Sequence, residues 1–406
     1  MTAAASAPSP AREWPRWGFT HTQFSADHGE PEAVTAIVGA LAQQPLVQVQ
    51  PIMGWGAGNP EPSPGMYDFE SLDSRMDFIR RSAGVPVITL CCAPDWMKGG
   101  QAGHTDWDEI ETAPLPQHFA DFAELSAVIA RRYPDVRHFM VWNELKGFFD
   151  DEAGKWDAEA YTDLYNQVYV ALKAVNPDIQ VGGPYMGMAT ARPNAWMHAS
   201  AVRGDWGALD RRSLDVVEYW LTHNVGADFV VVDGLATTAG GAPDEFAALG
   251  KLSAVSRWVR ERTSLPLWWA EWYVGPDRPD WSADRRVALR TAALIELAAA
   301  GADTVLYWNP APAGPGCASC LWTDTEEMGG GAPLPYLAVL QEFARSFPRG
   351  TPLVAVPEPP GVRILASPER LVAVNTTGEP RMFGQDGREV VLGPYETRWI
   401  TRTAIT

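Results

Sequence analysis

A short apolar run, a loop and a longer helical stretch recur in that order through most of the chain. The apolar runs are candidate β-strands, and the chain has eight of them, at residues 17–23, 46–52, 85–91, 136–142, 179–182, 229–232, 265–270 and 304–308. Segments between them carry apolar residues at helical spacing, which predicts helices over residues 119–132, 161–175, 246–261 and 285–300. Strands that alternate with helices form parallel sheets with right-handed crossovers.

Eight such units predict an α/β protein built as a (β/α)8 TIM barrel. A doubly wound open sheet is the alternative, and it is disfavoured because neither G-x-G-x-x-G nor G-x-x-x-x-G-K-[ST] follows an early strand. Beyond residue 349 the pattern changes to short strand-like segments joined by Pro- and Gly-rich turns, namely PLVAV, GVRILAS, RLVAVNTT, REVVL and TRWITRT. We therefore expect a disordered segment over 1–14, the barrel over 15–348 and a small antiparallel, β-sandwich-like domain over 349–406.

Charge and aromatic content restrict the class of partner. A net charge of −18 argues against DNA or RNA, because nucleic-acid binders need a basic face. The chain has 18 tryptophans, whose flat rings suit stacking on the apolar faces of sugars, although core packing also uses many of them. The N-terminus lacks the pattern of a signal peptide, and no apolar run is long enough to span a membrane. We expect a cytoplasmic protein with a carbohydrate ligand and no membrane partner; homo-oligomerisation stays open.

The four cysteines form two close pairs in the sequence, Cys91 with Cys92 and Cys317 with Cys320. Adjacent cysteines rarely bridge, and a lone C-x-x-C lacks the four ligands of a structural zinc site. The seven histidines show no metal-ligand spacing either. We therefore expect free thiols in a reducing compartment, and neither a metal nor another cofactor.

Two predicted strands end in a glutamate beside aromatic residues: Glu144 in FMVWNELKG and Glu271 in LWWAEWYVG. Active sites of TIM barrels lie at the C-terminal ends of the strands. The two glutamates are 127 residues apart, which fits three βα units of about 42 residues between strands four and seven. Either residue alone could be a salt-bridged strand end. Together they predict a pair of carboxyl groups across the barrel mouth, as a retaining glycosidase requires.

Trp142-Asn143-Glu144 after strand four, with a glutamate ending strand seven, resembles clan A of the glycoside hydrolases. The segment PGMYDFESLDSRMDFIRRSAGVPVITLCCAPDWM and the GGP at residues 182–184 are similar to family 39, and the resemblance covers nearly all of residues 15–400. It implies that Glu144 is the acid/base, that Glu271 is the nucleophile and that Asn143 hydrogen-bonds the sugar 2-hydroxyl. These roles require a raised pKa at Glu144, from an apolar surround or from the charge of Glu271, and an ionised Glu271.

Strand six departs from the family pattern D-F-x-x-x-H-x-Y. Asp233 stands in place of the histidine and Leu235 in place of the tyrosine that ordinarily contacts the nucleophile. Tyr185 or Tyr307 could replace that tyrosine as a hydrogen-bond donor. Asp233 could bind sugar hydroxyls or a cationic amine, or it could simply cap the next helix.

Other strand ends supply further candidates for the sugar pocket. These are His21, Trp55, Asp95, Trp96 and Trp308, of which Trp308 is expected to form the floor of the site. Asn309 follows Trp308, and the Gly-rich loop over 311–333 is either a lid or a surface excursion.

The sequence thus predicts a retaining, exo-acting glycoside hydrolase that acts by double displacement on small oligosaccharides or glycosides. Exo-action is expected because the chain shows no secretion signal. A xylosidase-like or arabinosidase-like specificity is the first guess. A transglycosylase would use the same two glutamates, and a non-catalytic carbohydrate-binding barrel is disfavoured because both glutamates are present.

Overall fold

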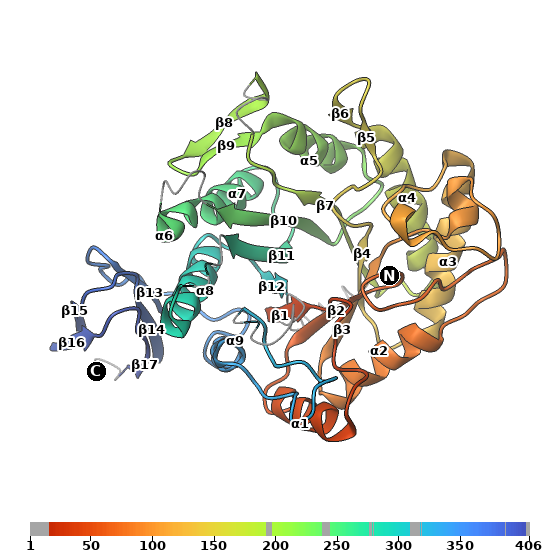
Figure 1. Ribbon diagram of the computed structural model, residues 1–406. Coiled ribbons are helices and arrows are strands. Elements are labelled where there is room, and N and C mark those ends of the chain that lie inside the picture. The colour runs from red at the N-terminus through yellow and green to blue at the C-terminus, as the bar shows by residue number, and fades with distance from the viewer. Residues whose placement is uncertain are drawn as a thin grey trace, which may run out of the picture.

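A closed barrel of eight parallel strands forms the centre of the computed structural model (Figure 1). The structure describes residues 16–191, 197–237, 244–275, 278, 280–308, 317, 319–385 and 387–402. In their order around the barrel, the strands are β1 (Trp17–Thr20), β12 (Thr304–Trp308), β11 (Leu267–Gly275), β10 (Phe229–Thr237), β7 (Gln180–Gly187), β4 (His138–Val141), β3 (Val85–Leu90) and β2 (Val47–Pro51). All eight predicted strands are confirmed, and the pairing of β1 with β12 closes the sheet and excludes the open alternative.

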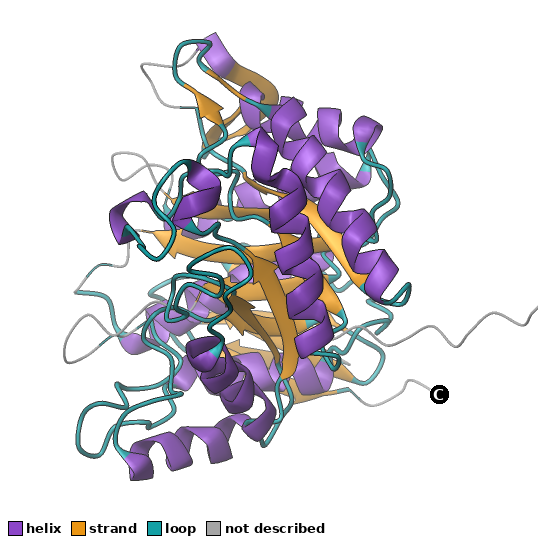
Figure 2. Ribbon diagram, turned by 90° about the vertical axis from the view of Figure 1, so that its right-hand side faces the viewer, coloured by secondary structure: helices purple, strands orange, loops and turns teal. Residues whose placement is uncertain are grey.

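Helices lie outside the barrel strands (Figures 1 and 2). They are α1 (Pro31–Leu41), α2 (Glu70–Arg81), α3 (Phe119–Arg132), α4 (Ala158–Val175), α5 (Arg211–His223), α6 (Glu245–Ala248), α7 (Gly250–Arg260), α8 (Ala283–Ala299) and α9 (Pro335–Ser346). The helix predicted over 246–261 is divided into α6 and α7. Two hairpins, β5 (Phe149–Asp150) with β6 (Lys155–Trp156) and β8 (Ala199–Gly204) with β9 (Gly207–Asp210), lie in the connections. Of the helices in the described ranges, none has both the length and the apolar character to cross a membrane.

Apolar side chains fill the inside of the barrel. Val49, Val87, Val231 and Leu306 come from four different strands and are fully buried in one cluster there. A barrel filled in this way is a packed core with no pore, so a ligand has access only at its ends.

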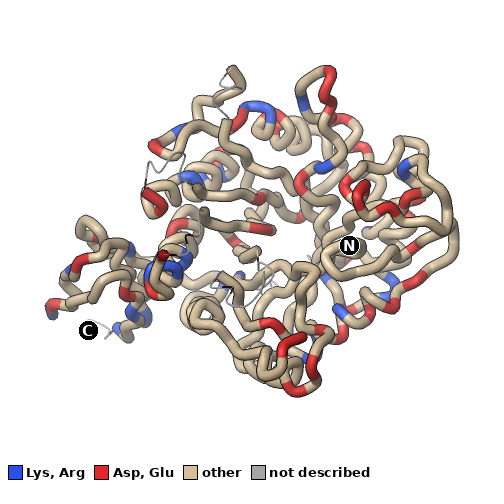
Figure 3. The backbone as a smooth tube through the Cα atoms, viewed as in Figure 1, with Lys and Arg blue, Asp and Glu red and all other residues tan. Residues whose placement is uncertain are grey.

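Charged residues are concentrated on the helices and loops around the barrel, while the central strands are mostly uncharged (Figure 3). A carboxyl group on a barrel strand is therefore unusual, because burying a charge without a partner is costly. Asp233 on β10 and Glu271 on β11 are two such carboxyl groups, and both are buried.

The C-terminal segment forms two small antiparallel sheets beside α8 (Figure 1). One contains β13 (Val362–Ala366), β14 (Arg370–Asn375) and β17 (Thr397–Thr401), and the other contains β15 (Arg381–Gln385) and β16 (Arg388–Leu392). Trp399 packs edge-on against Phe343 of α9, with ring centroids 5.1 Å apart. The predicted strand PLVAV is wrong: its residues form no strand, because nearby prolines cannot donate to a ladder. The domain boundaries stay predictions.

The expectation of four free thiols is also wrong. Cys91 is bonded to Cys92 just after β3, and Cys317 is bonded to Cys320 in the segment after β12. The Cα atoms of Cys317 and Cys320 lie 5.4 Å apart, within the usual range for a disulfide. The cysteines therefore no longer support a reducing compartment, and the cytoplasmic location stays a prediction.

Candidate active site

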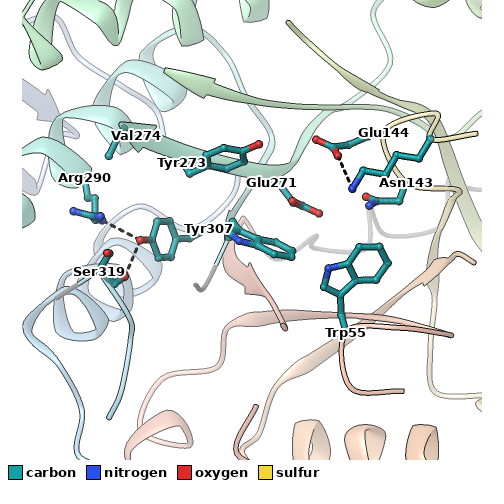
Figure 4. A pocket seen from close by; sticks show the side chains of 11 residues that line it. Trp55, Asn143, Glu144, Glu271, Tyr273, Val274, Arg290, Tyr307 and Ser319 are labelled. Carbon is teal, nitrogen blue, oxygen red and sulfur yellow. Dashed lines mark hydrogen bonds and ion pairs between the residues drawn. The ribbon is translucent and has the colours of Figure 1, made fainter. Parts of the chain in front are cut away.

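A pocket of about 390 Å³ opens at the C-terminal ends of the barrel strands (Figure 4). Glu144 and Glu271 both line it, as their positions at strand ends predict. The other lining residues are Trp55, Asn143, Lys146, Tyr273, Val274, Arg290, Tyr307, Trp308 and Ser319. Four further predicted residues, Trp55, Asn143, Tyr307 and Trp308, therefore lie at the same site. Asn309 and residues 311–316 of the predicted lid lie outside the described residues.

A tight turn after β4 carries Glu144. Three non-glycine residues of this turn have left-handed backbone angles, with φ of 69° at Trp142, 49° at Glu144 and 52° at Leu145. The buried Trp142 side chain donates from Nε1 to the Lys146 carbonyl oxygen at 2.7 Å and so braces the turn. Left-handed backbone is unfavourable for residues with side chains, and it persists where the surrounding structure imposes it, often at functional sites.

Lys146 is a site residue that the sequence reasoning missed. Its Nζ lies 3.2 Å from Glu144 Oε2 and 2.5 Å from Glu111 Oε1, and 5.6 Å from the centre of the Trp55 ring. Its place two residues after Glu144, in the loop following a barrel strand, is the signal that could have identified it. The Lys146 ammonium therefore places a positive charge directly beside Glu144, one of the two pocket glutamates.

Two irregularities in strand pairing position Glu271 and Tyr185. Between β10 and β11 the register passes from Val232–Trp269 to Asp233–Glu271, so that Ala270 is an extra residue. Between β7 and β10 it passes from Val231–Pro184 to Val232–Met186, which leaves Tyr185 as the extra residue. Bulges of this kind reorient side chains next to active sites.

Tyr185 donates a hydrogen bond of 2.5 Å from its hydroxyl to Glu271 Oε1. Its ring is buried, its φ is 54°, and the peptide bond before Pro184 is cis. Of the two tyrosines considered as replacements for the one missing at Leu235, Tyr185 is therefore the one whose hydroxyl contacts Glu271. Tyr307 does not take this role, because its hydroxyl donates to the Ser319 carbonyl oxygen at 2.7 Å.

The electrostatics of the two glutamates differ from the expectation. Burial and the charge of Glu144 raise the pKa of Glu271 to about 8, although the Tyr185 hydroxyl opposes the shift. Burial also disfavours ionisation of Glu144, but a hydrogen bond with Asp233 and the charge of Lys146 outweigh it and lower the pKa of Glu144. The expected raised pKa at Glu144 is therefore wrong for the free protein. Together the pair holds one proton at neutral pH.

His21 lies outside the pocket. Its Nε2 is 3.0 Å from Gln48 Oε1 and its Nδ1 is 2.8 Å from Ser25 Oγ, so both ring nitrogens have partners. Burial lowers its pKa to about 3, which keeps the ring neutral. Its role in the structure is to link β1 to β2 inside the fold.

Asp95 and Trp96 also lie away from the two glutamates. Asp95 Oδ2 accepts a hydrogen bond of 2.7 Å from the Asp106 backbone N–H, which anchors the loop after β3. Trp96 donates from Nε1 to the Glu61 carbonyl oxygen at 2.9 Å. These contacts hold the loops beside the pocket.

Alternation along β11 separates wall residues from core residues. Tyr273, two residues after Glu271, points to the same side and lines the pocket, whereas Trp272 is fully buried in the core. Arg290 of α8 was not predicted because its position is in a helix; its Nε donates to the Tyr307 hydroxyl at 2.9 Å. Within the described ranges, no group of three His, Cys, Asp or Glu side chains could hold a metal ion.

Comparison with known proteins places this pocket in context. Residues 59–309 match the model of the family described as glycosyl hydrolases family 39. A β-xylosidase of Caldicellulosiruptor saccharolyticus is 28% identical over 228 residues, which is 53% of this chain and 42% of that protein. The chain thus matches less than half the length of this curated relative.

Solved structures show the same fold. A family 39 glycoside hydrolase of Bacteroides cellulosilyticus superposes with a TM-score of 0.64 at 14% identity, covering 96% of this chain and 81% of the other. A family 39 β-xylosidase of Caulobacter crescentus superposes with a TM-score of 0.55 at 18% identity, covering 92% and 80%.

Replacement of Glu271 by Gln tests the electrostatic cost of burying this carboxyl group. An acid whose pKa rises on folding makes the protein less stable as the pH rises from the unfolded value, about 4.3, to the folded value, about 8. Gln keeps an acceptor for Tyr185 and has no charge. We expect Glu271→Gln to match the wild type near pH 4 and to be more stable by up to about 5 kcal/mol near pH 8.

Urea unfolding across this pH range measures the effect. Glu261→Gln is the matched control, because the Glu261 side chain is 73% exposed. A stability difference at Glu271 that does not grow with pH would contradict the account of this site.

Proposed function

The chain belongs to family 39 of the glycosyl hydrolases, and on this premise we propose that it is a retaining glycosidase. Glu271 is the nucleophile and Glu144 the acid/base. The observation that carries the proposal is that these two glutamates, one within β11 and one in the turn after β4, line one pocket. Two carboxyl groups flanking one bond are the minimum machinery for glycoside hydrolysis.

The first step forms a covalent glycosyl-enzyme. A carboxylate oxygen of Glu271 attacks the anomeric carbon while the bond to the leaving oxygen breaks, and Glu144 gives its proton to that oxygen. In the second step a water oxygen attacks the same carbon, its proton passes to Glu144, and the ester bond to Glu271 breaks. Two inversions give a product with retained configuration.

Substrate binding brings the shared proton to Glu144. The Glu144 side chain is 24% exposed in the free protein, whereas Glu271 is already buried. A glycoside in the pocket excludes water from Glu144 and therefore raises its pKa more than that of Glu271. The hydroxyl of Tyr185 then stabilises the negative charge that remains on Glu271.

The pocket supports a small substrate and exo-action. Its volume of about 390 Å³ is at the lower end of the range for small-molecule sites, ~300–1,000 Å³. Trp55 and Trp308 provide flat apolar walls for a sugar ring, and Asn143 provides an amide for a sugar hydroxyl. The relative from Caldicellulosiruptor saccharolyticus is a β-xylosidase, which makes β-D-xylosides the first substrates to test and arabinosides the second.

A screen of aryl glycosides tests the proposed function. We expect hydrolysis of at least one pentoside, and proton NMR should detect the first-formed sugar with the configuration of the substrate. Glu144→Gln should lower kcat/KM for substrates with poor leaving groups by about 10²–10⁴-fold. Product of inverted configuration, or no turnover across the screen, would overturn the proposal; oligosaccharides formed alongside the free sugar would favour transglycosylation.

Replacement of Tyr185 by Phe removes the donor to Glu271. A hydrogen bond to a charged group contributes about 1.5–3 kcal/mol, so kcat/KM should fall roughly 10- to 150-fold. The pKa of Glu271 should rise further, which moves the limb of the pH profile near pH 8 to higher pH. Tyr161→Phe is the control, because the buried Tyr161 hydroxyl donates to the Val141 carbonyl oxygen and touches no carboxylate. Equal losses in both variants would refute a specific role for Tyr185.

A further inference from the structure

Asp233 is a fully buried carboxyl group next to the two pocket glutamates. It lies on β10 directly beside Glu271 in the strand register, with no exposed surface. Asp233 does not line the pocket. The structure therefore does not support the predicted contact of Asp233 with sugar hydroxyls or with a cationic amine.

Gly187 at the end of β7 leaves room for the two acids to meet. A Cβ on Gly187 would stand 3.2 Å from Asp233 Oδ1 and 3.8 Å from Glu144 Oε1. The carboxyl groups of Asp233 and Glu144 therefore face each other beside this glycine, close enough for a hydrogen bond between them to shift the pKa of each. No N–H or O–H group of the described residues donates to either oxygen of Asp233. Two carboxylates cannot hydrogen-bond to each other, so such a bond requires a proton on one of the two groups.

The surroundings assign this proton to Asp233. Glu144 has the Lys146 ammonium 3.2 Å away and is partly exposed, and both features favour its carboxylate form. Asp233 has no exposed surface and faces the carboxylate of Glu144 and the protonated carboxyl group of Glu271, together with the neutral Tyr185 and Tyr273.

Lys251 of α7 is a buried cation that interacts electrostatically with Asp233. It donates from Nζ to the Leu235 carbonyl oxygen at 2.9 Å, and burial lowers its own pKa to about 8. Its charge therefore only partly opposes the neighbouring carboxylates. Burial and the charge of Glu144 raise the pKa of Asp233 well above its ordinary value.

We propose that Asp233 is a neutral carboxylic acid in the folded protein and a positioning residue whose O–H holds Glu144 as a carboxylate for the second step of the reaction. The proposal rests on the proposed function and deepens it. In the glycosyl-enzyme, Glu271 is an uncharged ester, and Glu144 must be ionised to accept the proton of water. Asp233 and Lys146 then stabilise that carboxylate from two sides, and Asp233 keeps its own proton throughout.

The variants Asp233→Asn and Asp233→Ala test whether Asp233 acts on Glu144 as a neutral hydrogen-bond donor or as a charged group. Asn keeps an uncharged donor toward Glu144, so both limbs of the pH profile should stay where the wild type has them. Ala removes the donor, so the acid limb of kcat for dinitrophenyl glycosides should move up by about one pH unit, because Glu144 binds its proton more tightly. Asp228→Asn, just before β10 and paired with Lys173 at 2.8 Å, is the control for the amide substitution.

Thermal unfolding tests the protonation of Asp233 without any turnover. If folding binds a proton at Asp233, the wild type loses stability as the pH rises above the unfolded pKa of about 3.9. Asn does not titrate, so the Asp233→Asn variant does not lose stability for this reason. Its Tm should therefore rise relative to that of the wild type by a few degrees between about pH 4 and pH 7. This measurement distinguishes a failure of the inference from a failure of the glycosidase assignment.

Three results would overturn the inference. The first is a shift of both activity limbs to lower pH in Asp233→Asn, which would mean that a negative charge has been removed. The second is an unshifted acid limb in a folded Asp233→Ala variant. The third is a Tm difference between Asp233→Asn and the wild type that stays constant or shrinks as the pH rises.

Discussion

Three carboxyl groups crowded into one dry barrel mouth set the conditions for the rest of this structure. Glu144, Asp233 and Glu271 lie close enough to perturb one another, and Asp233 and Glu271 are buried in the fold. Like charges at such distances cannot all ionise. The site therefore holds protons that isolated acids would release at neutral pH, and catalysis by this chain depends on where those protons sit.

The surrounding residues distribute the charge. In the free protein, Lys146 and Asp233 favour the ionised form of Glu144. The Tyr185 hydroxyl contacts Glu271 and stabilises a negative charge there when Glu271 is ionised. The single proton of the two glutamates can thus lie on Glu144, which is then an acid, or leave Glu144 ionised, which is then a base. A retaining mechanism needs both in succession, because the same residue protonates the leaving group and later deprotonates water.

The sequence was sufficient to favour the barrel, because eight apolar runs match its strand number, and the pairing of β1 with β12 then excluded an open sheet. It also located Glu144 and Glu271, since a carboxylate that ends an apolar strand is conspicuous. It named Tyr185 and Asp233 only among several candidates and could not determine their contacts, because strand bulges shift side chains by one position and break the period-two rule. The pKa order of the glutamates depends on Lys146, two residues from Glu144 in the sequence, and on Asp233, which approaches Glu144 only through the fold.

Azide rescue of alanine variants tests the assignment of the two glutamates most directly. With Glu271→Ala, azide takes the place of the missing nucleophile and attacks once, so the account predicts a glycosyl azide of inverted configuration. With Glu144→Ala, the glycosyl-enzyme still forms from an activated substrate, and azide attacks it to give a glycosyl azide of retained configuration. The opposite pairing of variant and product, or undiminished hydrolysis without azide in either variant, would contradict the account.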